Sequence, residues 1–184
     1  MLSERVLTNL VKGIAKQHLD LHPTDEKFFP GPKPGEKYML YMHVPFCQVL
    51  CPYCSFNRYP FRESVARPYF ENMRKEMMML KDLGYDFESL YIGGGTPTIM
   101  LDELCKTIDL ARDNFNIKEV SSETNPNHLV QPWLNELKGR VQRLSVGVQS
   151  FMNEKLRKLG RIHIADEALR AASHAGEVFG NFNL

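Results

Sequence analysis

The sequence predicts an α/β protein whose strands form a parallel sheet. Short apolar runs alternate along the chain with segments of helical period, which is typical of right-handed βαβ units. Residues suited to binding follow several of these runs, as expected when chemistry lies at the carboxyl ends of parallel strands. The chain has 184 residues, of which 43% are hydrophobic, and this is enough apolar material for one compact domain.

The first 37 residues are expected to form a helix and a linker ahead of the main domain at 38–184. Apolar residues share one stripe of a helix at 2–14, with Ser3 as a candidate N-cap and Gly13 near its end. Residues 29–35 contain three prolines and two glycines, which prevent both helix formation and strand pairing. This segment is therefore interpreted as a linker.

Five strands and their helices are expected in the main domain. The strands lie at 38–44, 89–92, 119–124, 141–148 and 178–184, and the helices at 68–83, 102–114, 129–137, 153–159 and 166–175. A terminal strand would leave an unpaired sheet edge without a covering helix. The chain is therefore expected to be a fragment of a longer protein, truncated in its fifth strand.

Composition argues against two classes of partner. Lys plus Arg (23) nearly balances Asp plus Glu (22), so no global field attracts nucleic acid or an anionic surface. No apolar run approaches the roughly 20 residues that span a bilayer, and charges interrupt the first 20 residues where a signal peptide would be apolar. We expect a cytoplasmic protein with no nucleic-acid partner and no stable membrane insertion.

Three of the four cysteines, Cys47, Cys51 and Cys54, crowd into eight positions directly after the first strand. Such crowding suits a metal in a reducing compartment, held by an irregular loop that directs all three sulfurs inward. We favour a 4Fe–4S cluster with one iron open to S-adenosylmethionine (SAM). The alternative is zinc, which would ordinarily take a fourth Cys or His, and His43 is the nearest candidate.

Other residues at predicted strand ends are candidates for binding. The glycines of 93–97 allow the backbone to approach a ligand. Taken without the other candidates, this segment would indicate only a tight turn. Glu123 ends the third strand and can accept hydrogen bonds, and Gln149 ends the fourth and can donate and accept. The remaining candidates are interpreted as structural: His43 and His163 as hydrogen-bonding residues, and Met73, Met77, Met78, Met79 and Cys105 as core.

Five ordered segments carry a family resemblance. The spacing Cys-x3-Cys-x2-Cys, with Tyr53 before the last cysteine, resembles the signature of the radical SAM superfamily. Residues 41–47, 93–98, 123–126 and 143–151, taken together, are similar to motifs of the oxygen-independent coproporphyrinogen III oxidase family, and the similarity extends over 38–184. This resemblance implies a partial (β/α)6 barrel of parallel strands. Residues 159–163 look closer to the haem chaperone branch of that family.

The resemblance also implies cofactors and the residues that hold them. Cys47, Cys51 and Cys54 match the ligands of a 4Fe–4S cluster, and SAM is the second cofactor. The matching SAM positions are Tyr53 against the adenine, Gly94, Gly95 and Thr96 at the methionyl end with Tyr41 beside them, and Glu123, Gln149 and Arg161 near the bound molecule. No catalytic residue is assigned.

Three activities are compatible with the family. The first expectation is an oxidase that forms a 5'-deoxyadenosyl radical for oxidative decarboxylation of a porphyrinogen propionate, with an electron donor such as flavodoxin or ferredoxin. Ser55-Phe56 stands where such oxidases usually have Gly-Cys. This difference favours the second reading, a haem chaperone that binds and transfers haem. The third is a radical SAM haem methyltransferase with the same cysteine loop.

Overall fold

The computed structural model describes residues 4–18 and 29–184. They fall into two compact units, Met1–Pro30 and Gly31–Leu184. In the first unit, α1 (Glu4–His18) carries the exposed apolar side chains Val6, Leu10, Val11 and Ile14. The expected N-cap, Ser3, lies outside the described residues. Gly13 does not end the helix, because one glycine costs only about 1 kcal/mol relative to alanine.

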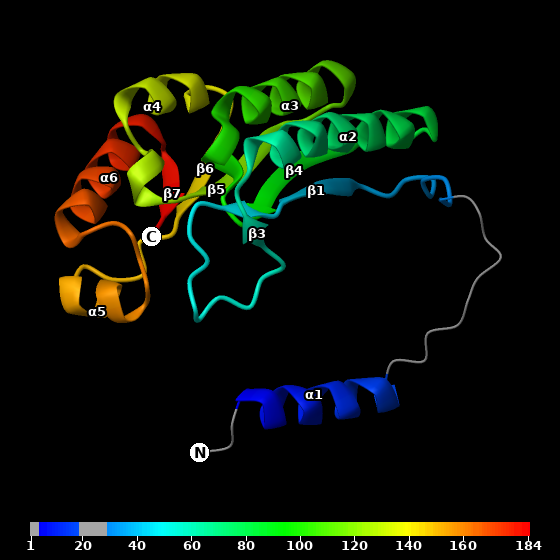
Figure 1. Cartoon of the computed structure of the whole chain (residues 1–184). Helices are drawn as coiled ribbons and strands as arrows, with labels where there is room; N and C mark the ends of the chain where they lie inside the picture. Colours follow the sequence, from blue (N-terminus) through cyan, green and yellow to red (C-terminus); the bar gives the residue numbers. More distant parts are fainter. Residues whose placement is uncertain (1–3, 19–28) are drawn as a thin grey trace. The chain divides into compact units, whose positions relative to one another are not determined.

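The second unit is built on one five-stranded parallel sheet (Figure 1). Its strands, in spatial order, are β1 (Tyr38–Val44), β4 (Phe87–Gly94), β5 (Glu119–Thr124), β6 (Arg143–Val146) and β7 (Asn181–Asn183). Because spatial order follows chain order, every right-handed crossover steps in the same direction and places its helix on the same face. This is the winding of a partial (β/α) barrel, so the predicted fold class is confirmed.

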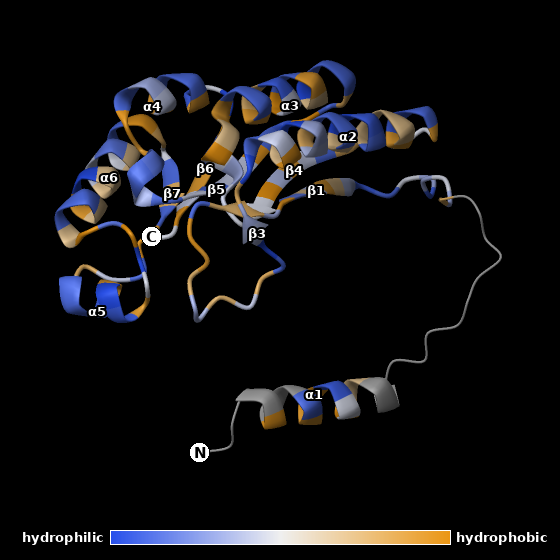
Figure 2. Cartoon of the chain, in the orientation of Figure 1, coloured by the Kyte–Doolittle hydropathy of each residue, from blue (hydrophilic) through white to orange (hydrophobic). Residues whose placement is uncertain are grey.

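Four helices cover the outer face of the sheet (Figure 1). They are α2 (Glu63–Asp82), α3 (Leu101–Asn114), α4 (Gln131–Leu137) and α6 (Ala165–Val178). Between them and the strands lies a core in which Phe70, Leu90 and Leu144 are fully or almost fully buried. The outer turns of α2 and α3 are largely hydrophilic (Figure 2). Within the described residues, no helix combines the length and apolarity needed to cross a membrane.

Helix α2 begins five residues earlier than predicted, so Pro68 lies inside it. The first turn is held by burial of Ala66 and by the ion pair between Arg67 and Glu63 at 2.7 Å. A proline near a helix start removes only one backbone hydrogen bond, which these interactions offset. The prediction that the helix starts at Pro68 was therefore wrong.

Several short elements differ from the sequence prediction. The 3-10 helices η1 (Pro97–Met100) and η2 (Pro126–His128) follow β4 and β5, and a two-stranded parallel pair joins β2 (Phe46–Cys47) to β3 (Tyr59–Pro60). Helix α5 (Asn153–Lys158) lies where predicted. The last strand is shorter than predicted because α6 continues to Val178.

Of the five residues interpreted as core, two are buried, Met73 and Met78 are partly exposed, and Met79 is exposed. Met77 and Cys105 are 2% and 7% exposed, and Met73 packs against the core. Met79, in contrast, is 63% exposed, so core packing was the wrong interpretation for this residue.

A buried carboxylate joins α2 to α3. Glu103 is 3% exposed and forms ion pairs with Arg74 at 2.6 Å, Arg67 at 2.8 Å and Lys106 at 2.9 Å. Burial alone would raise the pKa of Glu103, but the hydrogen bonds from Lys106 and Arg74 outweigh it and hold the pKa below its usual 4.5. A carboxyl whose pKa is lowered on folding stabilises the folded state above its ordinary pKa, and this contribution is lost as the pH falls through the folded-state pKa.

We predict that Glu103→Gln lowers the free energy of unfolding at pH 7 by about 2 kcal/mol, because three cations lose the negative charge that they share. The difference from the parent chain should shrink as the pH falls below 4.5. Urea denaturation at several pH values measures both effects. The control is Glu71→Gln, at an exposed position of α2. Equal losses in the two variants would contradict the account.

Candidate functional site

The cysteine loop is fixed at both ends by the short β2–β3 pair. Tyr59 N donates to Pro45 O at 2.6 Å, and Phe61 N donates to Cys47 O at 2.9 Å. Between these anchors the chain is irregular apart from turns, one of which is closed by Cys54 N donating to Cys51 O at 3.1 Å. Both ends of the cysteine loop are therefore held together just after the carboxyl end of β1.

One cavity of about 370 Å³ brings the three cysteines together with most of the predicted binding residues. Seven of the eight predicted SAM residues line it: Tyr53, Gly94, Gly95, Thr96, Glu123, Gln149 and Arg161. These side chains and backbone segments come from the ends of β1, β4, β5 and β6. The volume lies within the roughly 300–1,000 Å³ that is usual for small-molecule sites.

The cysteines differ in their surroundings. Cys47 and Cys51 are buried, whereas Cys54 is partly exposed, and all three are free thiols. Thr96 Oγ1 donates to Cys47 Sγ at 3.7 Å. Burial raises the pKa of the Cys47 thiol, which the hydrogen bond from Thr96 partly opposes. A metal group that binds this sulfur would therefore displace a proton.

Arg161 joins the cysteine loop to the loop after β6. Its guanidinium donates to Cys51 Sγ at 3.3 Å, to Asn125 Oδ1 at 2.7 Å and to Gly147 O at 2.6 Å. Its Nε is buried and has no partner among the described residues. Arg58 is similar: it donates to Cys51 O and has a buried Nε without a described partner. Both guanidinium groups thus have spare donors beside the cavity.

Glu123 links β5 to the glycine loop after β4. Its carboxylate accepts from Tyr91 OH at 2.6 Å and from Gly94 N at 3.1 Å. Burial and this hydrogen bond to Glu123 raise the pKa of Tyr91 to about 12, so the phenol remains a donor.

The glycines are required by close contacts. Gly94 has a φ of +116°, and a Cβ there would lie 2.7 Å from the ring of His43. A Cβ on Gly95 would lie 2.7 Å from Phe46 O, a backbone atom that cannot move aside easily. The fourth strand, β6, ends at Val146, so Gln149 lies three residues beyond the strand that it was expected to end. Gln149 also has a positive φ, of 68°, which is strained for a residue with a side chain.

Tyr53 and Tyr41 occupy different places. Tyr53 is 44% exposed at the cavity, and its phenol lies beside Cys51 and Arg161. Tyr41 does not line this cavity. Its OH is hydrogen-bonded to His43 Nδ1 at 2.8 Å, and its ring stacks on Tyr91 with centroids 5.8 Å apart.

The two histidines have structural partners. His43 Nε2 contacts Asn57 O at 2.8 Å, so both ring nitrogens of His43 are engaged. His163 is 2% exposed, with Nε2 3.1 Å from Val148 O. Burial lowers the pKa of His163, which keeps the ring neutral. The interpretation of both as hydrogen-bonding residues is confirmed.

Sequence reasoning missed four polar residues of the cavity: Arg58, Thr124, Asn125 and Ser145. Asn125 donates to Thr96 Oγ1 at 2.9 Å, and so supports the group that contacts Cys47. Its position directly after the strand at 119–124 was a usable signal. Ser145 lies inside a predicted strand, and Arg58 stands four residues beyond the last cysteine, so neither position was distinctive.

Comparisons with known proteins identify relatives of this chain. The family model for the radical SAM superfamily matches residues 41–183. The chain is 35% identical over 153 residues to the heme chaperone HemW of Bacillus subtilis, covering 78% of this chain and 40% of that protein. It is 35% identical over 160 residues to HemW of Escherichia coli, covering 79% and 41%.

A mammalian relative and a solved structure extend the comparison. Radical S-adenosyl methionine domain-containing protein 1, mitochondrial, of Mus musculus is 32% identical over 163 residues, covering 82% of this chain and 36% of the relative. The crystal structure of methylornithine synthase (PylB) has a TM-score of 0.50 and 13% identity, covering 79% of this chain and 43% of that one, and so supports the fold alone. The chain spans about 40% of the length of the HemW proteins.

Proposed function

Because this chain belongs to the radical SAM superfamily, we propose that Cys47, Cys51 and Cys54 hold a 4Fe–4S cluster and that SAM binds beside it. The observation that carries the proposal is the single cavity lined by all three thiols and by seven of the predicted SAM residues. The superfamily itself implies both cofactors. The assignment of individual ligands to these residues is the proposal.

The residues fit a cluster better than a single ion. Within the described ranges, no three Cys, His, Asp or Glu side chains are close enough to hold one metal ion. A cluster suits such thiols, because each cysteine then binds a different iron. Zinc would need a fourth protein ligand, and both nitrogens of the nearest candidate, His43, are already hydrogen-bonded.

The chain's own groups would orient SAM and compensate charge. Arg161 and Arg58 have spare buried N–H groups, which suit an anionic cluster or the carboxylate of SAM. Glu123 has acceptors for the ammonium or ribose, and Gln149, which lines the same cavity after the neighbouring strand β6, can donate and accept. When bound, the cluster and SAM supply one-electron cleavage of the sulfonium to a 5'-deoxyadenosyl radical.

For the whole protein we propose haem binding and transfer rather than porphyrinogen oxidation. Two observations support this proposal. Ser55 and Phe56 line the cavity at the positions where oxidases of the family have Gly-Cys. Two relatives are named heme chaperones. Oxidative decarboxylation and haem methylation remain predictions from the family resemblance. A cytoplasmic location remains a prediction from the sequence.

The cluster proposal predicts that Cys47→Ala, Cys51→Ala and Cys54→Ala each abolish iron and sulfide incorporation on anaerobic reconstitution. Cys105→Ala, a buried thiol on α3 outside the cavity, should keep the cluster and lose about 1 kcal/mol of packing energy. Iron and acid-labile sulfide analysis measures the first effect, and denaturation the second. Stoichiometric zinc without sulfide in the parent chain would overturn the proposal.

The chaperone proposal predicts that the reconstituted full-length protein binds haem and passes it to a haem-free acceptor protein. Incubation of the reduced protein with SAM and coproporphyrinogen III should then yield no vinyl product. Absorbance spectra follow haem transfer, and chromatography measures the vinyl product and 5'-deoxyadenosine. Coupled formation of these two products would replace the chaperone by the oxidase. Failure to bind either tetrapyrrole would refute both, while leaving the cluster assignment intact.

A further inference from the structure

Positive charge is concentrated in two segments of an otherwise balanced chain. Residues 45–62 and 147–164 contain six basic residues, which are Arg58, Arg62, Lys155, Arg157, Lys158 and Arg161, and one acidic residue, Glu154. Their net charge is +5, whereas the whole chain carries +1, so all other residues together carry −4. Overall composition conceals this local asymmetry.

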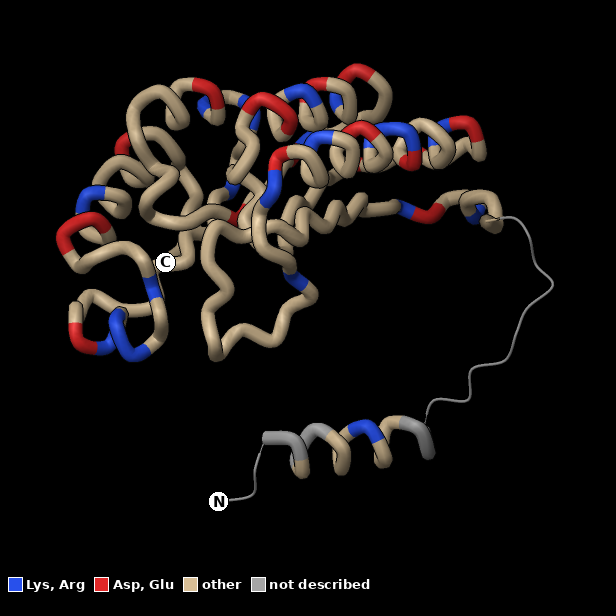
Figure 3. The backbone as a smooth tube through the Cα atoms, in the orientation of Figure 1, with Lys and Arg blue, Asp and Glu red and all other residues tan. Residues whose placement is uncertain are grey.

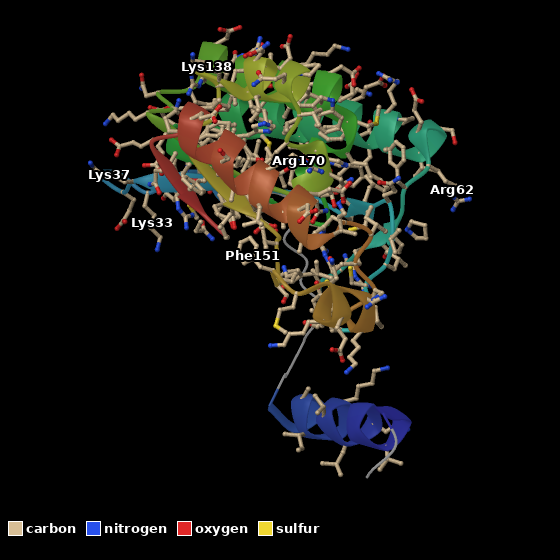
Figure 4. The ribbon with its side chains drawn as sticks, turned by 90° about the vertical axis from the view of Figure 1, so that its left-hand side faces the viewer. Lys33, Lys37, Arg62, Lys138, Phe151 and Arg170 are labelled. Carbon is tan, nitrogen blue, oxygen red and sulfur yellow. The ribbon has the colours of Figure 1, made fainter. Side chains whose placement is uncertain are left out.

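The two segments lie together at the carboxyl edge of the sheet. A Cβ on Gly160 would lie 2.9 Å from Pro52 Cδ, and Arg161 contacts Cys51 Sγ at 3.3 Å. Figures 1 and 4, viewed 90° apart, both place α5 beside the cysteine loop. In Figure 3 this loop carries no acidic residue, and α5 carries more basic than acidic residues. The site of the cysteines and the concentration of charge therefore share one surface.

The charges on α5 are available to a partner. Lys155 and Arg157 are exposed and have no carboxylate within ion-pair distance among the described residues. Lys158 is paired with Glu154 at 2.7 Å, but the pair is exposed and is therefore worth little. Helix α5 thus carries two exposed positive charges, Lys155 and Arg157, without an ion-pair partner among the described residues.

Exposed apolar side chains surround the mouth of the cavity. Val49, Tyr53 and Phe56 line the cavity from the cysteine loop and are 42%, 44% and 64% exposed. Ile162 is 49% exposed and shares a small adjoining pocket with Val49. An apolar centre with charge around it is the usual composition of a protein–protein contact.

From these observations we infer that the cysteine loop and α5 form the docking surface for a small acidic electron-carrier protein of the flavodoxin or ferredoxin class. The inference rests on the proposed cluster and names the partner surface that serves it. One electron leaves the reduced carrier, which is oxidised by one electron, and reduces the cluster on Cys47, Cys51 and Cys54. No bond forms or breaks. Charge attraction speeds encounter, and the apolar centre permits a brief, close contact.

The test compares two double charge reversals in the full chain. Lys155→Glu/Arg157→Glu changes the proposed surface, and Lys75→Glu/Lys138→Glu makes the same change in charge at exposed positions of α2 and at the end of α4. Calorimetry gives the dissociation constant of oxidised flavodoxin at low and high salt, with and without the cluster. Stopped-flow absorbance gives the rate of cluster reduction by reduced flavodoxin and by dithionite.

We expect the α5 variant to bind flavodoxin about tenfold more weakly at low salt and to accept its electrons about tenfold more slowly, with dithionite reduction unchanged. High salt should weaken binding by the parent chain, and the control should behave as the parent does. Equal effects in both variants, or salt-independent binding, would overturn the inference. Competition between anionic phospholipid vesicles and flavodoxin for Lys155 and Arg157 would also overturn the inference.

These readouts separate the two proposals. A chain without iron and sulfide refutes the cluster, but binding of flavodoxin to that chain still tests the surface. The docking surface alone is refuted if the cluster is intact and reduced by dithionite, but the α5 charge reversal leaves the affinity for flavodoxin unchanged.

Discussion

The close approach of the glycine loop after β4 to the segment after β1 is the constraint on which the site depends. Gly95 N donates to Val44 O and Thr96 N donates to Phe46 O, both at 2.8 Å. Only glycine at 95 leaves room for Phe46 O. This contact places Thr96 on Cys47 and so sets where the cysteine loop begins. A β-carbon on residue 95 would push apart the two segments that form the base of the cavity.

Arg161 closes the opposite side of the same cavity. It contacts one cysteine, one residue after β5 and one carbonyl after β6, so a single guanidinium holds together segments that lie 14 to 110 residues from it in sequence. Arg58 adds a second positive group from within the cysteine loop. Negative charge that builds up at three thiolates and a cluster would therefore meet positive charge already in place.

The alternation of parallel strands with helices and the placement of residues after strands could be predicted from the sequence, because period and motif position both depend on the backbone. Seven of eight proposed SAM residues share a cavity for this reason. The place of Tyr41 could not be predicted: it lies three residues before the end of β1, and its phenol is held by His43 and Tyr91. Arg58 and Ser145 were missed because only tertiary packing directs them to the cavity. The early start of α2 involves burial of Ala66 and the pair between Arg67 and Glu63 in its first turn. Arg67 also pairs with Asp102 and Glu103 of α3, and no local pattern reveals these contacts.

The proposed site would leave one iron of a cysteine-bound cluster accessible to SAM. The most direct measurement is the EPR spectrum of the reduced, reconstituted full chain before and after SAM is added. The account predicts that SAM changes the g values of the cluster, and that Arg161→Met, which removes the spare donors beside Cys51, weakens this response more than Arg170→Met on the exposed side of α6 does. A fully assembled cluster whose spectrum is unchanged by saturating SAM would contradict it.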